Sequence, residues 1–128
     1  MQSLEIGKVI YAVLSTDSRL TTLVGNKIFP LIVDNDTTTY PFIVYRRYKI
    51  TANYTKDFHL SDEVLIDINC FSQTYEEGLK IAGIVRDILE DKRFTDKGIQ
   101  SIKLESADED WINDAYIQTL SFTIKINK

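Results

Sequence analysis

Residues 39–47 read TYPFIVYRR, an apolar run of aromatic and β-branched residues that opens with a proline and closes with two arginines. Such residues favour strands, and Pro41 biases the residue before it, Tyr40, toward an extended backbone. The run therefore predicts a strand over residues 42–50, followed by a turn near Asn53. It contains no nucleophile, metal-ligand set or phosphate-binding loop, so it indicates assembly rather than chemistry.

Further strands are predicted on both sides of this run. Residues 27–33 contain Pro30, which cannot donate to a ladder, so they form an edge strand at most. Residues 63–71 alternate between apolar and polar side chains, which is typical of a strand with one buried face. The buried set is Val64, Ile66, Ile68 and Cys70, and two later strands are expected over residues 99–105 and 116–126.

Two helices complete the expected fold. The first is predicted to begin near Ser3 as its N-cap, with a short additional helical turn at residues 19–24 that Gly25 ends. The second begins at about Tyr75, capped by Ser72 or Thr74, and its apolar residues cover more than half of its circumference. Such a helix is either buried on more than one side or in contact with another subunit.

The order of these elements predicts one α+β domain over residues 1–128, with a mainly antiparallel sheet and two helices packed on one face. A chain of 128 residues can bury a core of its own. Its net charge of −4 disfavours a protein that tracks nucleic-acid phosphates, because Arg46, Arg47 and Lys49 are too few to form a basic footprint. No stretch approaches the roughly 20 apolar residues of a membrane span, and no signal peptide is expected.

A search for catalytic chemistry gives no convincing set. Cys70, the one cysteine, lies in an apolar strand and is expected to be a buried, unreactive thiol in a reducing compartment. His59 has no partner in the sequence that would make a catalytic pair. The acidic residues 34–36 and 108–110 lack the pattern of a calcium loop, and residues 105–114 are interpreted as a solvated turn rather than as catalytic carboxylates. Trp111, within that turn, is expected either to fold onto the core, the favoured alternative, or to meet a partner.

Four stretches carry a resemblance to a known family. They are IGKVIYAVL at residues 6–14, LTTLVGNKIFP at 20–30, YPFIVY at 40–45, and the strand and helix over 64–89. In this order the chain resembles the short tail-completion, or tail-terminator, proteins of tailed bacteriophages and prophages. The resemblance implies a virion structural protein with no enzymatic activity, no catalytic residues, no metal and no cofactor.

The resemblance also implies partners. Such proteins form a ring, typically hexameric, at the head-proximal end of the tail tube, where they stop tube polymerisation and dock to the head connector. The expected partners are thus copies of the same chain, the tail tube protein and the head–tail connector protein. DNA passes through without specific binding, and no membrane is involved. The expected location is the virion tail, assembled in the cytoplasm of the bacterial host.

Two groups of residues are candidates for this role. Ring contacts are expected from large apolar side chains in the aromatic strand, the second helix and the acidic stretch, namely Tyr40, Phe42, Tyr45, Ile84 and Trp111. The acidic residues Asp108, Glu109 and Asp110 are candidates for lining a DNA channel, since acidic walls repel phosphates. Three other functions remain open: a non-catalytic ligand- or peptide-binding α+β domain that uses the aromatic strand, a neighbouring head–tail connector protein, and a small hydrolase that uses the acidic stretch.

Overall fold

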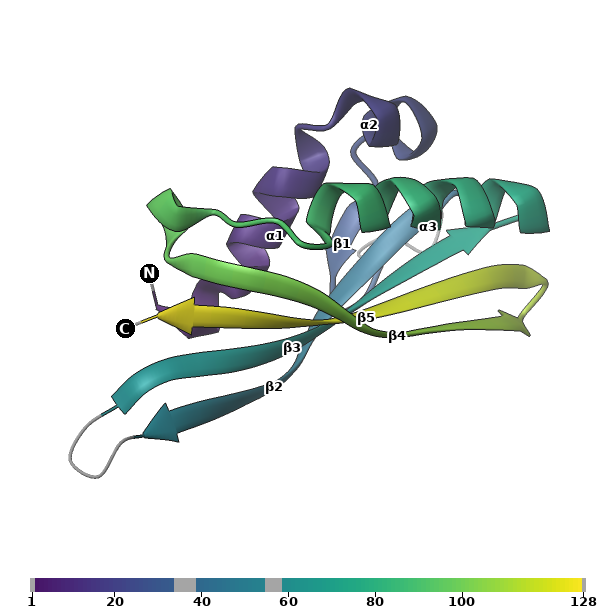
Figure 1. The fold of residues 1–128 in the computed structure, drawn as a ribbon. Helices are drawn as coiled ribbons and strands as arrows, with labels where there is room; N and C mark the ends of the chain where they lie inside the picture. Colours follow the sequence, from purple (N-terminus) through teal and green to yellow (C-terminus); the bar gives the residue numbers. More distant parts are fainter. Residues whose placement is uncertain (1, 34–38, 55–58, 128) are drawn as a thin grey trace.

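The computed structural model describes residues 2–33, 39–54 and 59–127, apart from the side chains of His59 and Leu60. Within this part of the chain, five strands form one sheet in the order β1-β2-β3-β5-β4, and three α-helices lie on one side of it (Figure 1). β1 runs parallel to β2, and every other pair is antiparallel. The elements are η1 Ser3–Glu5, α1 Ile6–Ser15, α2 Ser18–Val24, β1 Ile28–Pro30, β2 Phe42–Tyr54, β3 His59–Ser72, α3 Tyr75–Leu89, η2 Thr95–Lys97, β4 Ile99–Ile112 and β5 Ala115–Asn127. The α+β prediction is confirmed, and the predicted short helical turn is a third helix, α2.

The helices cover the sheet face that the alternation of β3 predicted to be buried. Val64, Ile66, Ile68 and Cys70 are all fully buried, which confirms that prediction. α1 crosses β1 and β2, while α3 lies along β3, β4 and β5 and touches α1 and α2 at its side. Burial on more than one side therefore explains most of the broad apolar surface of α3, although Leu79 is 44% exposed and Ile84 only half-buried. The helical part of the core consists of Ile6, Ile10, Leu14, Leu20, Val24, Ile81, Ala82, Val85, Ile88 and Leu89.

Both strands of the β2–β3 pair are longer than predicted. β2 continues to Tyr54, so the prediction of a turn near Asn53 was wrong, and the Asn53 side chain donates a hydrogen bond to Ser61 Oγ of β3 at 3.3 Å. In Figure 1 this end of the pair extends past the helices, opposite the end at which β4 and β5 are joined.

The two outer long strands contain extra residues, and in β4 there are two of them, Gln100 and Glu105. Tyr48 lies in β2 between Arg47, which faces Ile66, and Lys49, which faces Leu65. Glu105 of β4 lies in a corresponding register shift. Such a β-bulge reverses the alternation of side chains beyond it. The bulges explain why these two strands do not show a clean alternating pattern, whereas β3 and β5 do.

The starts of α2 and α3 are capped by side chains of the preceding residue, whereas α1 has no side-chain cap. At α3 the predicted cap is Thr74, whose Oγ1 accepts a hydrogen bond from the Glu77 N–H at 3.2 Å. Ser3 does not cap α1, contrary to the prediction, because α1 begins at Ile6 and the Ser3 hydroxyl instead donates to Asp62 Oδ2 at 2.5 Å. That buried contact ties the beginning of the chain to β3.

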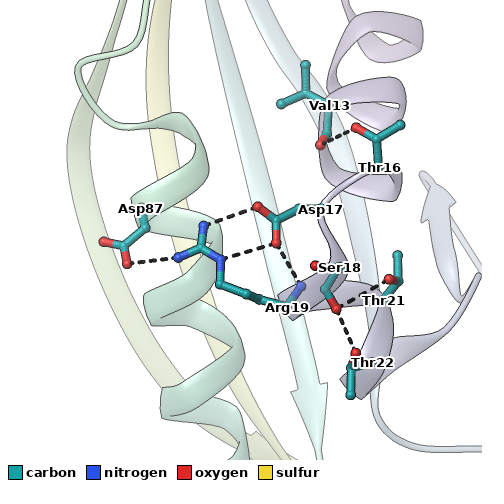
Figure 2. A network of polar contacts seen from close by, with 8 residues as sticks. All are labelled: Val13, Thr16, Asp17, Ser18, Arg19, Thr21, Thr22 and Asp87. Carbon is teal, nitrogen blue, oxygen red and sulfur yellow. Dashed lines mark hydrogen bonds and ion pairs between the residues drawn. The ribbon is translucent and has the colours of Figure 1, made fainter.

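Asp17 both caps α2 and connects it to α3 (Figure 2). Its Oδ1 accepts from the Arg19 N–H at 2.9 Å, and the Arg19 guanidinium donates back to the same carboxylate at 3.2 and 3.1 Å. Hydrogen bonding to Arg19 lowers the pKa of Asp17 below its ordinary value. Arg19 also lies 3.6 Å from Asp87 of α3, so a chain of charges joins the two helices. No helix in the described part of the chain is both long enough and apolar enough to cross a membrane.

Candidate assembly surfaces

Among the described side chains, no group of His, Cys, Asp and Glu is placed to hold a metal ion. Cys70 is fully buried, and burial raises the pKa of its thiol to about 12. The prediction of a buried cysteine is confirmed, and a thiol with a raised pKa is a weak nucleophile at neutral pH. The His59 side chain and residues 34–36 lie outside the described residues.

Residues 105–112 form a strand, so the prediction of a turn over residues 105–114 was wrong, although the side chains of this stretch are exposed to solvent as expected. β4 continues to Ile112, and the chain reverses through Asn113 and Asp114, whose φ values are 52° and 62°. Two-residue hairpin turns require positive φ at both central positions, and Asn and Asp adopt it more easily than most residues. An Asn-Asp pair between two strand-forming runs was the signal in the sequence. The surrounding carboxylates obscured it.

Trp111 lies exposed at the end of this hairpin. Its side chain is 56% exposed and that of Ile112 is 49% exposed, so the favoured prediction that Trp111 folds onto the core was wrong. The hairpin end is instead held by Tyr75 of α3, whose hydroxyl donates to Glu109 Oε1 at 2.8 Å and whose ring meets that of Tyr116 edge-on at 5.8 Å. We call the exposed pair Trp111 and Ile112 the hairpin tip.

Phe42 forms the centre of an aromatic cluster on the sheet face that no described helix covers, here called the helix-free face. Its ring stacks on Tyr40 at 5.2 Å and on Phe71 at 4.7 Å, and meets Phe29 edge-on at 6.4 Å. Phe42 is only 8% exposed, while Tyr40 is half-buried. Phe42 therefore stabilises the subunit itself, whereas Tyr40, like Phe29 and Phe71, is half-buried and can be reached by a partner.

The other two candidates for ring contacts lie on the helix side. Tyr45 is buried beneath α1, where a Cβ on Gly7 would lie 3.3 Å from the tyrosine ring. Ile84 is half-buried on α3 and lines a shallow groove that also includes Leu23 and Lys80. Tyr45 is thus a core residue of the subunit, whereas one side of Ile84 is accessible.

The outer edges of β2 and β4 are each covered along one half only. β1 pairs with β2 as far as Tyr45, and no described strand pairs with the outer side of residues 46–54. The outer edge of β4 is covered at its beginning, where the Asp91 N–H donates to the Ile102 carbonyl at 2.9 Å and Phe94 forms a bridge with Ile99. Beyond these contacts, no described strand covers residues 103–112. Within the described residues, each outer strand therefore leaves one half of its edge unpaired.

The two unpaired edges carry opposite charge. We call the exposed side chains Arg46, Arg47 and Lys49 of β2 the basic edge, and the exposed side chains Glu105, Asp108, Glu109 and Asp110 of β4 the acidic edge. Residues 46–54 include no acid, and residues 104–112 include no lysine or arginine. None of these seven side chains takes part in an ion pair within the described part of the chain.

Comparison with known proteins gives one family. The model of the family described as tail completion protein gp17 matches residues 8–126. The chain belongs to this family. As a member of the tail completion family it is a structural protein of the bacteriophage tail, and a virion component that associates with other phage proteins. No protein of curated function matches the chain.

The fold of this tail completion protein also occurs in a solved structure. A chain of the "Virion of native gene transfer agent (GTA) particle" matches with a TM-score of 0.79 and 15% sequence identity, over 93% of this chain and 92% of that one. At that identity the likeness concerns the fold alone.

From the sequence we named individual candidate residues of this tail completion protein, but we did not identify the basic edge or the acidic edge. Asp108, Glu109 and Asp110 are brought together, on adjacent positions of one strand. Tyr40, Ile84 and Trp111 lie on different elements, and no described contact joins them. The opposite charge of the edges was hidden because a sequence does not tell which strands are outermost in a sheet.

Proposed function

We propose that the protein closes the tail tube as a ring of copies, six in the form that the resemblance implies, at the end nearest the head. In this role it ends polymerisation of the tube protein and provides the surface to which the head connector docks. The observation that carries the proposal is the match of the tail completion family over residues 8–126, nearly the whole chain. Assembly of the virion tail in the bacterial cytoplasm is part of the same proposal.

Deletion of the gene from the parent phage or prophage tests this role. We expect tails of abnormal length that do not join heads, because nothing would stop the tube or present a docking surface. Tail length, measured by electron microscopy, separates the role from that of a connector, whose loss would leave tails of normal length unattached. Normal infectious particles would contradict the proposal.

We further propose that the helix-free face, which is polar over much of its area, contributes to the wall of the channel. Alternation along β4, together with the pairing of Asp108 with Thr119 and of Asp110 with Ile117, directs these two carboxylates to the helix-free face. Glu109 points to the helix side and contacts Tyr75. Carboxylates on such a wall repel DNA phosphates and let the DNA slide. An assembled ring with Asp108 and Asp110 on its outer rim would contradict this part of the proposal.

Contact with partner proteins is proposed for the exposed apolar residues. The hairpin tip presents Trp111, a residue type that is enriched in the centres of interfaces. Tyr40 and Ile84 are accessible on opposite faces of the sheet and remain candidates for contacts with a neighbouring copy or with the tube. Phe42 and Tyr45 are buried, and we propose that they contribute indirectly, by holding β2 in place.

A further inference from the structure

We propose that the basic edge of one copy contacts the acidic edge of the next, so that the copies join head to tail. This inference rests on the ring proposed above and names the surfaces that build it. The two edges lie on the outer strands β2 and β4, at opposite sides of the same sheet. A contact between different surfaces of identical subunits is heterologous, and it closes into a ring when the rotation from copy to copy divides a full turn.

The signs of the charges select this pairing over the alternatives. Unpaired strand edges tend to associate, and natural proteins often place charges on them to prevent it. If the charges served only that purpose, one sign on both edges would be sufficient. Here two acidic edges repel each other, as do two basic edges, and only the mixed contact brings together opposite charges. Arg46, Lys49 and Asp108 have no ion-pair partners in the described part of the subunit. When copies pair in this way, each of the three side chains gains a partner of opposite charge.

The register of the sheet predicts how the copies are offset. Through β3 and β5, Arg46 lies level with Ser106, since Arg46 faces Asp67, Asp67 faces Ser121 and Ser121 faces Ser106. Measured along the strands, the midpoint of the acidic edge is therefore closer to the hairpin tip than the midpoint of the basic edge is. The charges meet when the next copy is displaced along the strands by about three residues, on the order of 10 Å. β1 covers the start of β2, and the segment with Phe94 covers the start of β4. These covered halves lie at opposite ends of the sheet (Figure 1), so a displacement along the strands is also needed to bring the uncovered halves together.

An apolar hollow beside the basic edge fits the same contact. It is lined by Leu4, Pro30, Leu31, Arg46 and Arg47. Leu4 is 62% exposed and Leu31 is 66% exposed. At the other side of the sheet the acidic edge ends in the exposed pair Trp111 and Ile112. Each edge thus combines charge with exposed apolar surface, as interfaces with a desolvated centre do.

Charge reversal tests the pairing. The first variant carries Arg46→Glu and Lys49→Glu, and the second carries Glu105→Lys and Asp108→Lys. In a phage that lacks the gene, we expect either variant to lower the yield of infectious particles at least about tenfold, because each places like charges opposite one another at the substituted positions. A chain with all four substitutions restores opposite charges at these four positions and should recover the yield. The thermal unfolding of each purified variant shows that it is folded.

Mixing the two reversed variants gives a second, independent test. Each copy of one variant then finds its complement only in the other, so co-expression should rescue assembly in rings in which the two alternate. Matched controls are Lys92→Glu with Arg93→Glu, and Asp91→Lys with Asp96→Lys, which change the net charge by the same amount at exposed positions that belong to neither the basic edge nor the acidic edge. These controls should give yields close to the wild type.

Disulfide trapping places the contact directly. Arg46→Cys with Asp108→Cys in one chain should give, on oxidation of isolated tails, a ladder of covalent oligomers that ends at a closed ring. Cys70 does not interfere, because it is fully buried. Either cysteine variant alone should remain monomeric. Dimers from a single variant would show that like edges meet, and this result would overturn the proposal.

The outcomes separate this inference from the proposed function. If deletion of the gene leaves normal particles, the role in tail completion fails. If deletion is defective but both charge-reversed variants complement as well as the wild type, the role stands and the pairing of edges is wrong. Failure of the fourfold variant, with both controls active and all variants folded, would also overturn the pairing.

Discussion

The hydroxyl of Tyr75 donates a hydrogen bond to Glu109 Oε1 at 2.8 Å and joins the first residue of α3 to the outermost strand of the sheet. This hydrogen bond raises the pKa of the Tyr75 hydroxyl above its ordinary value. The tyrosine ring also packs against Tyr116 on the adjacent strand. Tyr75 therefore holds both strands of the hairpin that carries Trp111, and the position of the hairpin tip depends on the start of α3.

Tyr75→Phe is expected to loosen the hairpin while the subunit remains folded. The substitution keeps the ring and removes the hydroxyl that donates to Glu109. Hydrogen–deuterium exchange should become faster for amides in residues 106–118 and stay unchanged in β3. The matched control is Tyr11→Phe, at another exposed tyrosine. Equal exchange in the hairpin of wild type and Tyr75→Phe would show that the hydroxyl does not hold it.

Gly78→Ala is expected to lower the free energy of unfolding by about 1–3 kcal/mol, because it overpacks a closed site. A Cβ at position 78 would lie 2.6 Å from Ser72 Oγ, and Ser72 is itself fully buried and donates to the Thr74 carbonyl. Urea denaturation measures the change. The control is Gly83→Ala on the same helix, where no atom lies within 4 Å. That change should stabilise the protein by about 0.5–1 kcal/mol.

A double substitution identifies the cause of the Gly78 effect. Ser72→Ala removes the hydroxyl that an alanine at position 78 would strike, and the remaining neighbours of the new Cβ lie at 3.6 and 3.7 Å. The double variant should therefore be more stable than the sum of the two single changes predicts. Strict additivity would place the cause elsewhere, in the backbone of α3.

Ile84→Asp and Val85→Asp are expected to differ although they are adjacent. Ile84 is half-buried beside the groove that Leu23 and Lys80 line, so a carboxylate there can reach water. Val85 is fully buried, and an unpaired charge in its place has no partner. Circular dichroism should show a folded Ile84→Asp protein and an unfolded Val85→Asp protein. If Ile84→Asp also unfolds, Ile84 is a core residue, and its proposed contact with a neighbour is wrong.

Trp111→Ala is expected to impair assembly while leaving the stability of the subunit nearly unchanged. Because Trp111 is more than half exposed, its removal should change the free energy of unfolding by less than about 0.5 kcal/mol. Infectious yield should nevertheless fall, since the hairpin tip is proposed to meet a partner. Tyr11→Ala, at an exposed aromatic residue on α1, is the control for loss of surface aromatic area. Wild-type yield with Trp111→Ala would exclude the tip from the interfaces.

Cys70 predicts a dependence of stability on pH. Its thiol has a pKa of about 12 when folded, against an ordinary value of 9.0. The folded state therefore keeps a proton that the unfolded state loses, so this contribution to stability is complete below pH 9.0 and declines as the pH rises toward 12. The slope from one group is at most about 1.4 kcal/mol per pH unit. Urea denaturation at several pH values should show a shallower decline for Cys70→Ala, and an identical slope would contradict this origin.

The central strands could be predicted from the sequence because one face of each is buried and the other is not. β3 shows this alternation without interruption, and its buried residues were identified correctly. β2 and β4 are harder to predict, since the bulges at Tyr48 and Glu105 shift the alternation partway along each strand. The outer end of β2 also projects beyond the helices, where no apolar pattern marks it (Figure 1).

The candidate site was less predictable than the fold. The acids at positions 108–110 were noticed as a group, but whether they form a turn or a strand depends on the Asn113-Asp114 reversal that follows. Arg46, Arg47 and Lys49 were set aside as too few to bind DNA. Their relation to the acids appears only when the order of strands in the sheet is known, because that order places the two groups on opposite edges.

The bulges have one more consequence. A straight strand laid along β2 or β4 would lose its hydrogen bonds at the extra residue, because backbone spacing on the two sides would no longer match. Neighbouring copies can therefore attract each other through side chains without forming a continuous intermolecular sheet by backbone hydrogen bonding. Each outer strand can thus bind the oppositely charged edge of another copy but is a poor template for fibre growth. This property favours a finite assembly over aggregation.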